Sequence, residues 1–280
     1  IMLTAFNNLG YSVEWRVINA ADYGRSQRRR RVFFFVFRND TKYAKSLDNK
    51  YENEDIVFEE HKYDDYLFQT GLFATQFPIK QAPVKNRQVF YELEDDIVAV
   101  SDNFTGTVWN TGVMRHGKYY SIETAANFDG NPITLGEILQ DETEVPDKYF
   151  LTDKAKLEKF QYLRGPKKLE RTSADGHTYI YSEGGMSPYD DLNLPGRTML
   201  TSEGTVNRST HFLFVNNKYR LLTPIEAERL QDFPDDWTAY KKLEDGTVVE
   251  VSDKMRMFFM GNALVTEIVR KIGDFIKTID

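Results

Sequence analysis

The sequence predicts an α/β fold in which two neighbouring strands form the edge of a larger sheet, joined to a mixed α+β domain. Residues 13–17 alternate apolar and polar side chains, as half-buried strands do. Residues 32–37 are apolar on both faces, which is typical of a strand buried inside a sheet. Together, residues 11–37 predict two adjoining strands whose sheet lies mostly outside this chain.

The segments around these strands have weaker patterns. Residues 3–9 read as the end of a helix that stops at Gly10, and a turn separates the two strands. Residues 39–66 are polar and acidic, and we interpret them as a solvated loop or insertion. Residues 88–125 alternate loosely between glycines and predict short strands.

The remaining helices are predicted from spacing and capping signals. Residues 150–163 place apolar side chains at helical spacing behind a candidate cap. Residues 223–226, Thr-Pro-Ile-Glu, form a capping box with proline at the first helical position, and the helix must end before Pro234. Residues 261–263 precede a helix with an apolar stripe over 265–276.

The composition excludes several kinds of site. The 280 residues are 41% hydrophobic and 28% charged and contain no cysteine. This excludes disulfides, zinc–thiolate sites and a cysteine nucleophile within the chain. The four histidines lie far apart without ligand-like spacing, so no metal site is predicted. No apolar run approaches the ~18 residues of a membrane span, and the first residues lack the pattern of a signal peptide.

The charge is unevenly distributed along the chain. The net charge is −7, but residues 1–38 hold seven arginines against two acidic residues, a local charge of +5 that leaves −12 for the remainder. Arg28 to Arg31 are consecutive and lead directly into the apolar strand. Guanidinium groups are almost never fully buried unless they are paired, and their planar fork fits phosphate and base edges. The pattern therefore predicts a directed contact with an anionic partner.

Three separated segments point to a family. They are residues 24–33 (GRSQRRRRVF), residues 220–234 (RLLTPIEAERLQDFP) and residues 260–265 (MGNALV), with about 180 residues between the first two. Their content, order and spacing resemble the last three motifs of the cytosine-5 DNA methyltransferases. In that family a Gln-Arg-x-Arg block precedes a long variable region, which is followed by an Arg-x-Leu-Thr-x-x-Glu…Gln-x-Phe-Pro block and Gly-Asn-Ala/Ser. Ser26 stands where the family usually has proline.

The resemblance implies a division of the chain into three segments. Residues 1–38 would be the C-terminal strands of a catalytic domain with a doubly wound methyltransferase sheet. Residues 39–217 would be a mixed α+β target-recognition domain with an acidic insertion, and residues 218–280 would return to the catalytic domain. The family's Gly-rich cofactor loop, Pro-Cys nucleophile motif and Glu-Asn-Val motif would lie upstream of Ile1. We therefore expect the chain to be cut from a longer protein.

The family's chemistry suggests roles for two arginines. A thiolate adds to carbon 6 of a cytosine that has left the helix stack, and carbon 5 then takes a methyl group from S-adenosylmethionine. On an extended strand Arg29 and Arg31 share one face. By resemblance, Arg31 would reach the exocyclic oxygen of the flipped cytosine, and Arg29 would brace the catalytic loop or a phosphate. The alternative is a basic strand end paired with carboxylates, which carries more weight for Arg28 and Arg30.

The third motif is the predicted cofactor contact. Gly261, Asn262 and Ala263 are expected at a helix N-terminus, where free amides and the positive end of the dipole favour a carboxylate or polar ligand. The resemblance places the amino-acid end of S-adenosylmethionine near these residues. The alternative is that Asn262 only caps the helix.

Recognition of a DNA sequence is expected from loops, because side chains that reach base edges read sequence. Residues 197–210 combine arginine, small hydroxyl side chains and glycine, and residues 184–187 are a second candidate. Ordinary loop structure is the alternative for each position, and residues 220–234 are interpreted mainly as scaffold. The residues expected to contact DNA are Gln27, Arg197, Thr198, Met199, Ser202, Arg208, Ser209 and Arg220.

The predicted function is that of the C-terminal part of a DNA (cytosine-5-)-methyltransferase, inactive until it is joined to an N-terminal catalytic half. Its partners would be double-stranded DNA and that missing half, with no membrane, in a bacterial cytoplasm and a restriction–modification setting. An alternative is a separate DNA-specificity subunit without activity of its own. A degenerate DNA-binding module is a third interpretation, and Arg29, Arg31 and Asn262 argue against it.

Overall fold

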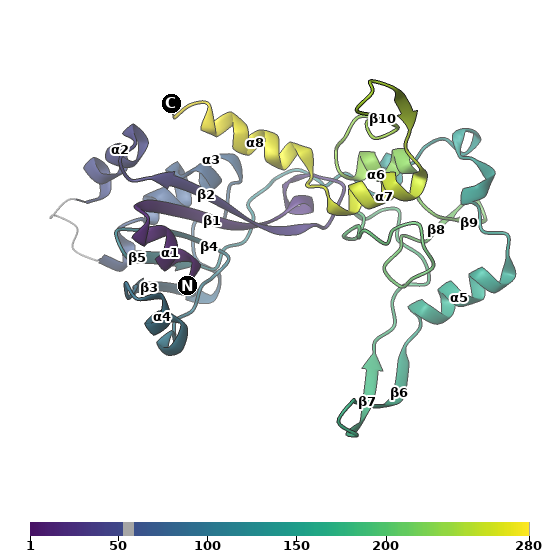
Figure 1. Ribbon diagram of the computed structural model, residues 1–280, viewed down its shortest axis with the longest axis horizontal. Coiled ribbons are helices and arrows are strands. Elements are labelled where there is room, and N and C mark those ends of the chain that lie inside the picture. Colours follow the sequence, from purple (N-terminus) through teal and green to yellow (C-terminus); the bar gives the residue numbers. More distant parts are fainter. Residues whose placement is uncertain (53–58, 280) are drawn as a thin grey trace. The chain divides into compact units, whose positions relative to one another are not determined.

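The computed structural model describes residues 1–52 and 59–279 and divides the chain into two compact units (Figure 1). Unit 1 comprises residues 1–24, 30–131 and 267–280, and unit 2 comprises residues 25–29 and 132–266. This division differs from the three segments that the family resemblance implies. The three segments are catalytic and recognition regions implied by the family resemblance, and that assignment remains a prediction.

Unit 1 is built on a five-stranded sheet. Its strands are β1 (Tyr11–Asn19), β2 (Arg30–Arg38), β3 (Gln88–Glu92), β4 (Thr111–Arg115) and β5 (Lys118–Ile122), in the order β2-β1-β4-β5-β3. Every pairing in this sheet is antiparallel. The strands predicted at 13–17, at 32–37 and within 88–125 are therefore confirmed. The parallel part of a doubly wound sheet is not found among the described residues.

The surroundings of β1 and β2 differ from the prediction. β1 is hydrogen-bonded on both sides, to β2 and to β4, so a large part of its sheet lies within this chain. Among the described residues β2 is an edge strand, so the expectation that residues 32–37 lie inside a sheet stays a prediction. Val32 and Phe34 are 49% and 40% exposed, whereas Phe35 and Phe37 face the core. One face of β2 therefore packs on the core of unit 1, and the apolar side chains of its other face are exposed among the described residues.

Helices and turns cover the sheet of unit 1. The helices are α1 (Met2–Asn8), α2 (Lys42–Tyr51), α3 (Leu72–Gln76), α4 (Ile97–Asn103) and the greater part of α8 (Thr266–Ile276). The expected solvated insertion at 39–66 instead begins with α2, which buries Ala44, Leu47 and Tyr51 against the core. Residues 53–58 of that segment lie outside the described residues.

Buried polar side chains attach β1 to the segment that follows α2. Arg16 donates hydrogen bonds to the carbonyl oxygens of Phe73 (3.0 Å) and Phe77 (2.8 Å). Glu14 accepts from the backbone amides of Leu72 and Phe73, both at 3.1 Å. Burial raises the pKa of Glu14 to about 7, although Arg16 and these hydrogen bonds oppose the shift. The segment around α3 is thus an integral part of unit 1.

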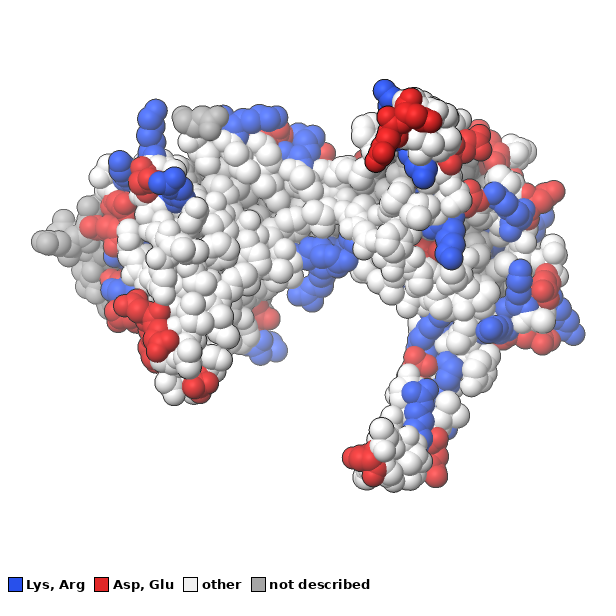
Figure 2. All heavy atoms as spheres, viewed as in Figure 1, with Lys and Arg blue, Asp and Glu red and all other residues white. Residues whose placement is uncertain are grey.

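Unit 2 consists of short helices and strands. They are α5 (Lys154–Arg164), β6 (Lys167–Thr172), β7 (Thr178–Glu183), β8 (Leu213–Val215), β9 (Lys218–Arg220), α6 (Pro224–Leu230), β10 (Tyr240–Lys242), β11 (Val248–Glu250) and α7 (Asp253–Asn262). The strands pair as three antiparallel hairpins. The β6–β7 hairpin extends away from the rest of unit 2 (Figure 1), and Figure 2 shows Lys and Arg side chains along it.

The local signals predicted two helices of unit 2 well. Asp153 caps α5 by accepting from the backbone amides of Ala155 and Lys156. Thr223 and Glu226 form the expected capping box at the start of α6, which ends before Pro234. Leu222, Ala227 and Leu230 then pack with Met199, and with Met257 and Met260 of α7. The helix of the second motif therefore shares a core with the third motif.

The expected helix start at residues 261–263 was wrong. Asn262 is the last residue of α7, Ala263 is its C-cap, and α8 begins only at Thr266. The segment from Asp253 to Asn262 contains only charged and apolar residues before Gly261, and its helix simply runs through that glycine. Asn262 therefore lies at a helix end with unpaired carbonyl groups and not at one with free amides.

Candidate functional site

The three sequence motifs converge within unit 2. We call the place where residues 25–29, 196–201, 230–232 and 260–261 meet the motif junction. Its backbone frame is a strand-like pairing in which Gly196 N donates to Ser26 O (2.7 Å) and Arg28 N donates to Gly196 O (2.8 Å). The hydroxyl of Thr198 extends this pairing by donating to Arg28 O at 2.6 Å. The first motif is thus joined directly to the predicted recognition segment.

Gln27 links the first motif to the second motif and to the recognition segment. Its Nε2 donates to Leu230 O at 3.0 Å, and its Oε1 accepts from Met199 N at 3.0 Å. The side chain is fully buried, so both ends of its amide are satisfied by backbone partners inside the protein. Gln27 therefore fixes the end of α6 and the start of the recognition segment relative to the first motif.

Arg29 occupies the centre of the junction. Nη1 donates to Met199 O and Nη2 donates to Gly261 O, both at 2.9 Å, and the residue is 3% exposed. Hydrogen bonds from a charged donor are stronger than neutral ones, and a buried guanidinium requires such partners. These contacts are those of a positioning residue that holds the recognition segment against the third motif.

Gly261 is required by its neighbours. A Cβ atom at this position would lie 2.4 Å from Thr201 N and 2.5 Å from both Leu200 C and Thr201 Cα. All three are backbone atoms, so no side-chain rotation can relieve the overlap. Next to it, Gln231 Nε2 donates to Met260 O at 2.6 Å and ties the second motif to the third.

Arg25 adds an ion pair to the motif junction. Its Nε and Nη2 atoms donate to the two carboxylate oxygens of Asp232, each at 2.8 Å. This bidentate pair again joins the first motif to the second. The sequence analysis did not predict this ion pair. The opposite charges of Arg25 and Asp232, each within a motif, are the signal that could have indicated it.

The remaining arginines of the first motif are not tied down in this way. Arg28 and Arg30 are exposed, and Arg31 is partly exposed at the start of β2, where its Nη1 donates to Arg30 O at 2.8 Å. Throughout the described ranges, no carboxylate forms an ion pair with these three arginines. The predicted alternation of 29 and 31 on one strand face does not apply, because β2 begins only at Arg30 and Arg29 belongs to unit 2.

The predicted recognition segment is stabilised by buried charges. Arg197 Nε donates to Asp190 at 2.5 Å, Arg164 pairs with the same carboxylate at 2.5 Å, and both arginines also donate to Thr210 O. Burial opposes ionisation of Asp190, but the Arg197 hydrogen bond and the surrounding positive charges outweigh it and lower its pKa to about 2. Arg197 is therefore committed mainly to the shape of the loop.

Exposure divides the residues that were expected to contact DNA. Ser202 is exposed, and Arg197, Thr198, Arg208 and Ser209 are partly exposed. Gln27, Met199 and Arg220 are buried, which corrects the expectation that their side chains face DNA in this conformation. Arg220 instead forms a bidentate pair with Glu226 at 2.7 and 2.8 Å, which fits the scaffold interpretation of the second motif.

The predicted cofactor contacts form only a small part of a binding site. Gly261 is buried, Ala263 is partly exposed, and Asn262 is exposed with its Nδ2 donating to Phe258 O at 3.3 Å. Because the end of α7 presents carbonyl groups, the argument from a helix N-terminus for binding a carboxylate does not hold here. These residues offer one amide side chain and do not by themselves fit a complete S-adenosylmethionine site.

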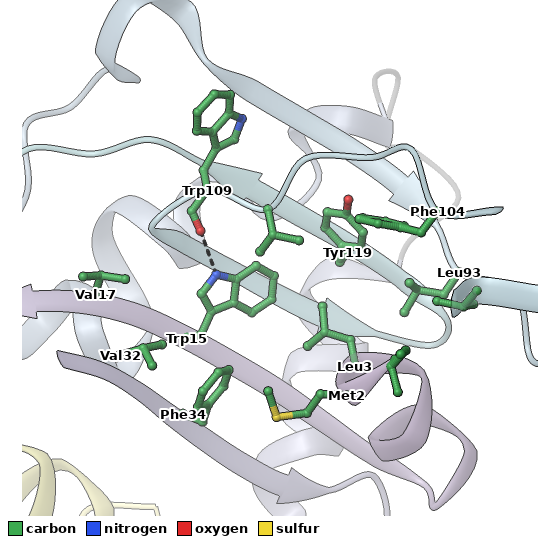
Figure 3. A pocket seen from close by; sticks show the side chains of 13 residues that line it. Met2, Leu3, Trp15, Val17, Val32, Phe34, Leu93, Phe104, Trp109 and Tyr119 are labelled. Atoms are coloured by element: carbon green, nitrogen blue, oxygen red, sulfur yellow. Dashed lines mark hydrogen bonds between the residues drawn. The ribbon is translucent and has the colours of Figure 1, made fainter. Parts of the chain in front are cut away.

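Unit 1 contains a separate apolar pocket of about 370 Å³ (Figure 3). Val32 and Phe34 of β2, Met2 and Leu3 of α1, and Trp15 of β1 lie around it. Trp15 Nε1 donates to Trp109 O at 3.1 Å, which leaves the indole ring directed into the pocket. The lining contains no carboxylate, histidine, lysine or thiol, and its one phenol, Tyr119, donates to Thr107 O at 3.1 Å, so the pocket suits an apolar surface. Its further residues are Ile1, Val17, Leu93, Val100, Phe104, Val108 and Tyr119.

Two other kinds of site are absent from the described part of the chain. No group of three or more His, Cys, Asp or Glu side chains is arranged to hold a metal ion among the described residues. None of the described helices has the length and apolar character that crossing a bilayer would require.

Comparison with known proteins gives a consistent result. A family model described as C-5 cytosine-specific DNA methylase matches residues 1–278. The type II methyltransferase M.Sau3AI of Staphylococcus aureus is 49% identical over all 280 residues, and the chain spans 62% of that relative's length.

Two solved structures align less well. A DNMT2 mutant of Spodoptera frugiperda aligns over 96% of this chain and 58% of its own, with a TM-score of 0.44 and 10% identity. The methyltransferase EhMeth of Entamoeba histolytica aligns over 73% of this chain and 56% of its own, with a TM-score of 0.32 and 13% identity.

Proposed function

Because this chain belongs to the C-5 cytosine-specific DNA methylase family, we propose that it is the C-terminal part of a DNA (cytosine-5-)-methyltransferase. In this proposal the chain binds a specific DNA site and completes the pocket in which a flipped cytosine receives a methyl group from S-adenosylmethionine. It acts only together with the part of the enzyme that carries the cofactor loop and the nucleophile. The setting would be restriction–modification, as for a type II methyltransferase.

The observation that carries this proposal is the motif junction. Residues 27 and 29 hold the backbone of 199, 230 and 261 through buried hydrogen bonds, although these positions are far apart in the sequence. A chain that only bound DNA would need the recognition segment but would have no need to fix the third motif beside it. The arrangement supports a recognition segment whose position is coordinated with a reaction site.

The absence of cysteine determines what this chain must obtain from elsewhere. Attack on carbon 6 of cytosine needs a thiolate, and none of the 280 residues can supply one. Residues 261–263 offer only one amide side chain to a cofactor, so most of the S-adenosylmethionine site must also come from elsewhere. We therefore assign the nucleophile and most of the S-adenosylmethionine site to the missing portion of the enzyme, and we assign base and DNA contacts to this chain.

Unit 1 offers two features suited to binding that missing portion. β2 is an edge strand whose outer backbone groups have no strand partner among the described residues, and such edges readily pair with another strand. The apolar pocket beside it exposes Val32, Phe34 and Met2. An exposed apolar recess next to a free edge is typical of a surface that another part of a protein covers.

Within the proposed enzyme the residues divide into four roles. Arg31 would contact the flipped cytosine, and Arg29 and Gln27 would act as positioning residues. Ser202 and the partly exposed Arg197, Thr198, Arg208 and Ser209 would serve DNA recognition. Asn262 and Ala263 would contribute one edge of the cofactor site. Residues 1–38 and 218–280 would belong to the catalytic domain and residues 39–217 to the recognition domain.

The proposal predicts that the isolated chain transfers no methyl group. Purified chain incubated with labelled S-adenosylmethionine and double-stranded DNA is expected to leave cytosine unlabelled, because the thiolate is missing. The same protein should still show a cooperative unfolding transition, which excludes misfolding as the cause. Stoichiometric labelling of cytosine by the chain alone would contradict the division of labour proposed here.

A further inference from the structure

We propose that the β6–β7 hairpin is a DNA-contacting ribbon that enters a groove of the duplex beside the recognition segment. This inference rests on the proposed function and adds to it a binding element that the sequence motifs did not include. Residues 167–183 were neither part of a family motif nor predicted as a DNA contact.

The hairpin has no packing partner of its own. β6 and β7 pair only with each other among the described strands, and nearly all their residues are exposed or partly exposed. Leu169, Tyr179 and Ile180 are 40%, 42% and 56% exposed. An isolated two-stranded hairpin is marginally stable in water, so a ribbon with apolar side chains on both faces is expected to be covered by a partner.

The charge of this region selects the partner. Residues 154–183, which span α5 and the whole hairpin, hold seven Lys and Arg against four Asp and Glu in a chain whose net charge is −7, and the hairpin alone holds three of each sign. Three of these cations pair within the protein: Arg164 with Asp190, Lys167 with Glu183, and Lys154 with Glu158 at 3.9 Å on the surface of α5. The four that remain are exposed (Lys156, Lys159, Lys168 and Arg171). A local excess of positive charge on an acidic protein favours an anionic partner, and in a DNA methyltransferase that partner is the duplex.

The geometry of the ribbon fits a groove. Each strand has six residues, which gives a length of about 20 Å at ~3.4 Å per residue. The major groove is about 12 Å wide and accommodates a two-stranded ribbon. Side chains alternate between the two faces along a strand, so Lys168 and Arg171, three residues apart in β6, lie on opposite faces. A ribbon that enters the groove tip first can turn these two cations toward the two phosphate backbones.

Contacts at the ribbon orient it relative to the recognition segment. Glu183 at the end of β7 pairs with Arg208 at 2.7 Å, and Arg208 belongs to residues 197–210. On the ribbon, the guanidinium of Arg171 lies 3.9 Å from the centre of the Tyr181 ring. Stacking of this kind holds the charge in place while leaving the edge of the guanidinium available for hydrogen bonds to phosphate.

The test is a salt series of duplex binding by the whole chain, with random-sequence DNA as the probe and fluorescence anisotropy as the readout. Lys168→Thr combined with Arg171→Thr keeps residues that suit a strand and removes two cations. We expect affinity to fall about tenfold or more at ~50 mM salt, and the slope of log K against log salt to lose about 2 in magnitude.

The β10–β11 hairpin provides a matched control. Lys241→Thr combined with Lys242→Thr removes two exposed cations from another hairpin strand of the same unit, and we expect it to change affinity by no more than about twofold. Equal losses in both double variants, or no loss in either, would overturn the ribbon proposal, as would a wild-type chain that binds no duplex. Equal losses, or no loss in either variant, would leave the proposed methyltransferase function standing, whereas a wild-type chain that binds no duplex would also contradict its DNA-binding part; the methyl-transfer assays test catalysis separately.

Discussion

Replacing Gly261 with alanine is expected to lower the free energy of unfolding by roughly 3 kcal/mol or more. The added Cβ would lie 2.4 Å from Thr201 N and 2.5 Å from Leu200 C, inside the distance that non-bonded atoms tolerate. Relief requires the recognition segment to move away from α7. That movement would also separate Met199 O and Gly261 O, the two carbonyl groups that Arg29 holds together.

Alanine is a better helix former than glycine, so a loss of stability in Gly261→Ala would have to come from the close contacts at residue 261 and not from helix propensity. In a helix interior the change from glycine to alanine stabilises by up to about 1 kcal/mol when the space is open. Gly273 in α8 provides that comparison, since a Cβ there would meet no atom within 4 Å. Urea unfolding should therefore show Gly261→Ala strongly destabilised and Gly273→Ala equal to or above the wild type. Similar midpoints for the two variants would contradict the close packing of the motif junction.

The second large effect is expected on catalysis by the assembled enzyme. When the missing portion is supplied, Arg31→Ala should lower kcat by roughly 100-fold or more, with a much smaller change in DNA affinity. The guanidinium of Arg31 has no carboxylate partner within the described part of the chain, so its charge is available for a substrate. A cation at the exocyclic oxygen of cytosine would stabilise the charge that develops when the thiolate adds to the ring.

Arg30 is the matched control for this prediction. It is adjacent, exposed and equally charged, but the extended backbone of β2 directs it to the opposite face. We expect Arg30→Ala to affect mainly DNA affinity and its salt dependence, and to leave kcat within a few-fold of wild type. Single-turnover rates at saturating DNA separate the two effects. An unchanged rate for Arg31→Ala, or equal losses of rate in both variants, would remove the proposed contact with the base.

Local patterns predicted the elements whose signals lie within a few residues. Alternation predicted β1, the apolar run predicted β2, and the capping box predicted the start of α6. Pairing between distant segments was not predictable in this way. Nothing in residues 11–38 indicates that β4 pairs with β1, because that register depends on side chains almost 100 residues away.

The candidate site shows the same limit. The motifs correctly identified the segments that converge in unit 2, but residue roles depended on which side chains became buried. Gln27 and Arg220 carry polar groups that suit DNA contact, yet backbone and carboxylate partners inside the protein satisfy them. Arg29 and Arg31 resemble each other in sequence, but the pairing of 25–29 with residue 196 separates Arg29 from β2. Burial and long-range pairing decide these outcomes, and composition and spacing do not.

A chimaera would test directly whether this chain completes a cytosine-5 methyltransferase. The portion of the Staphylococcus aureus relative that this chain does not cover would be fused ahead of residue 1, and labelled methyl transfer to DNA would be measured. We expect methylation of carbon 5 of cytosine at a defined sequence, with activity lost when the nucleophilic cysteine supplied by the fused portion is replaced. A folded chimaera that binds DNA but transfers no methyl group would contradict the claim that this chain completes a cytosine-5 methyltransferase.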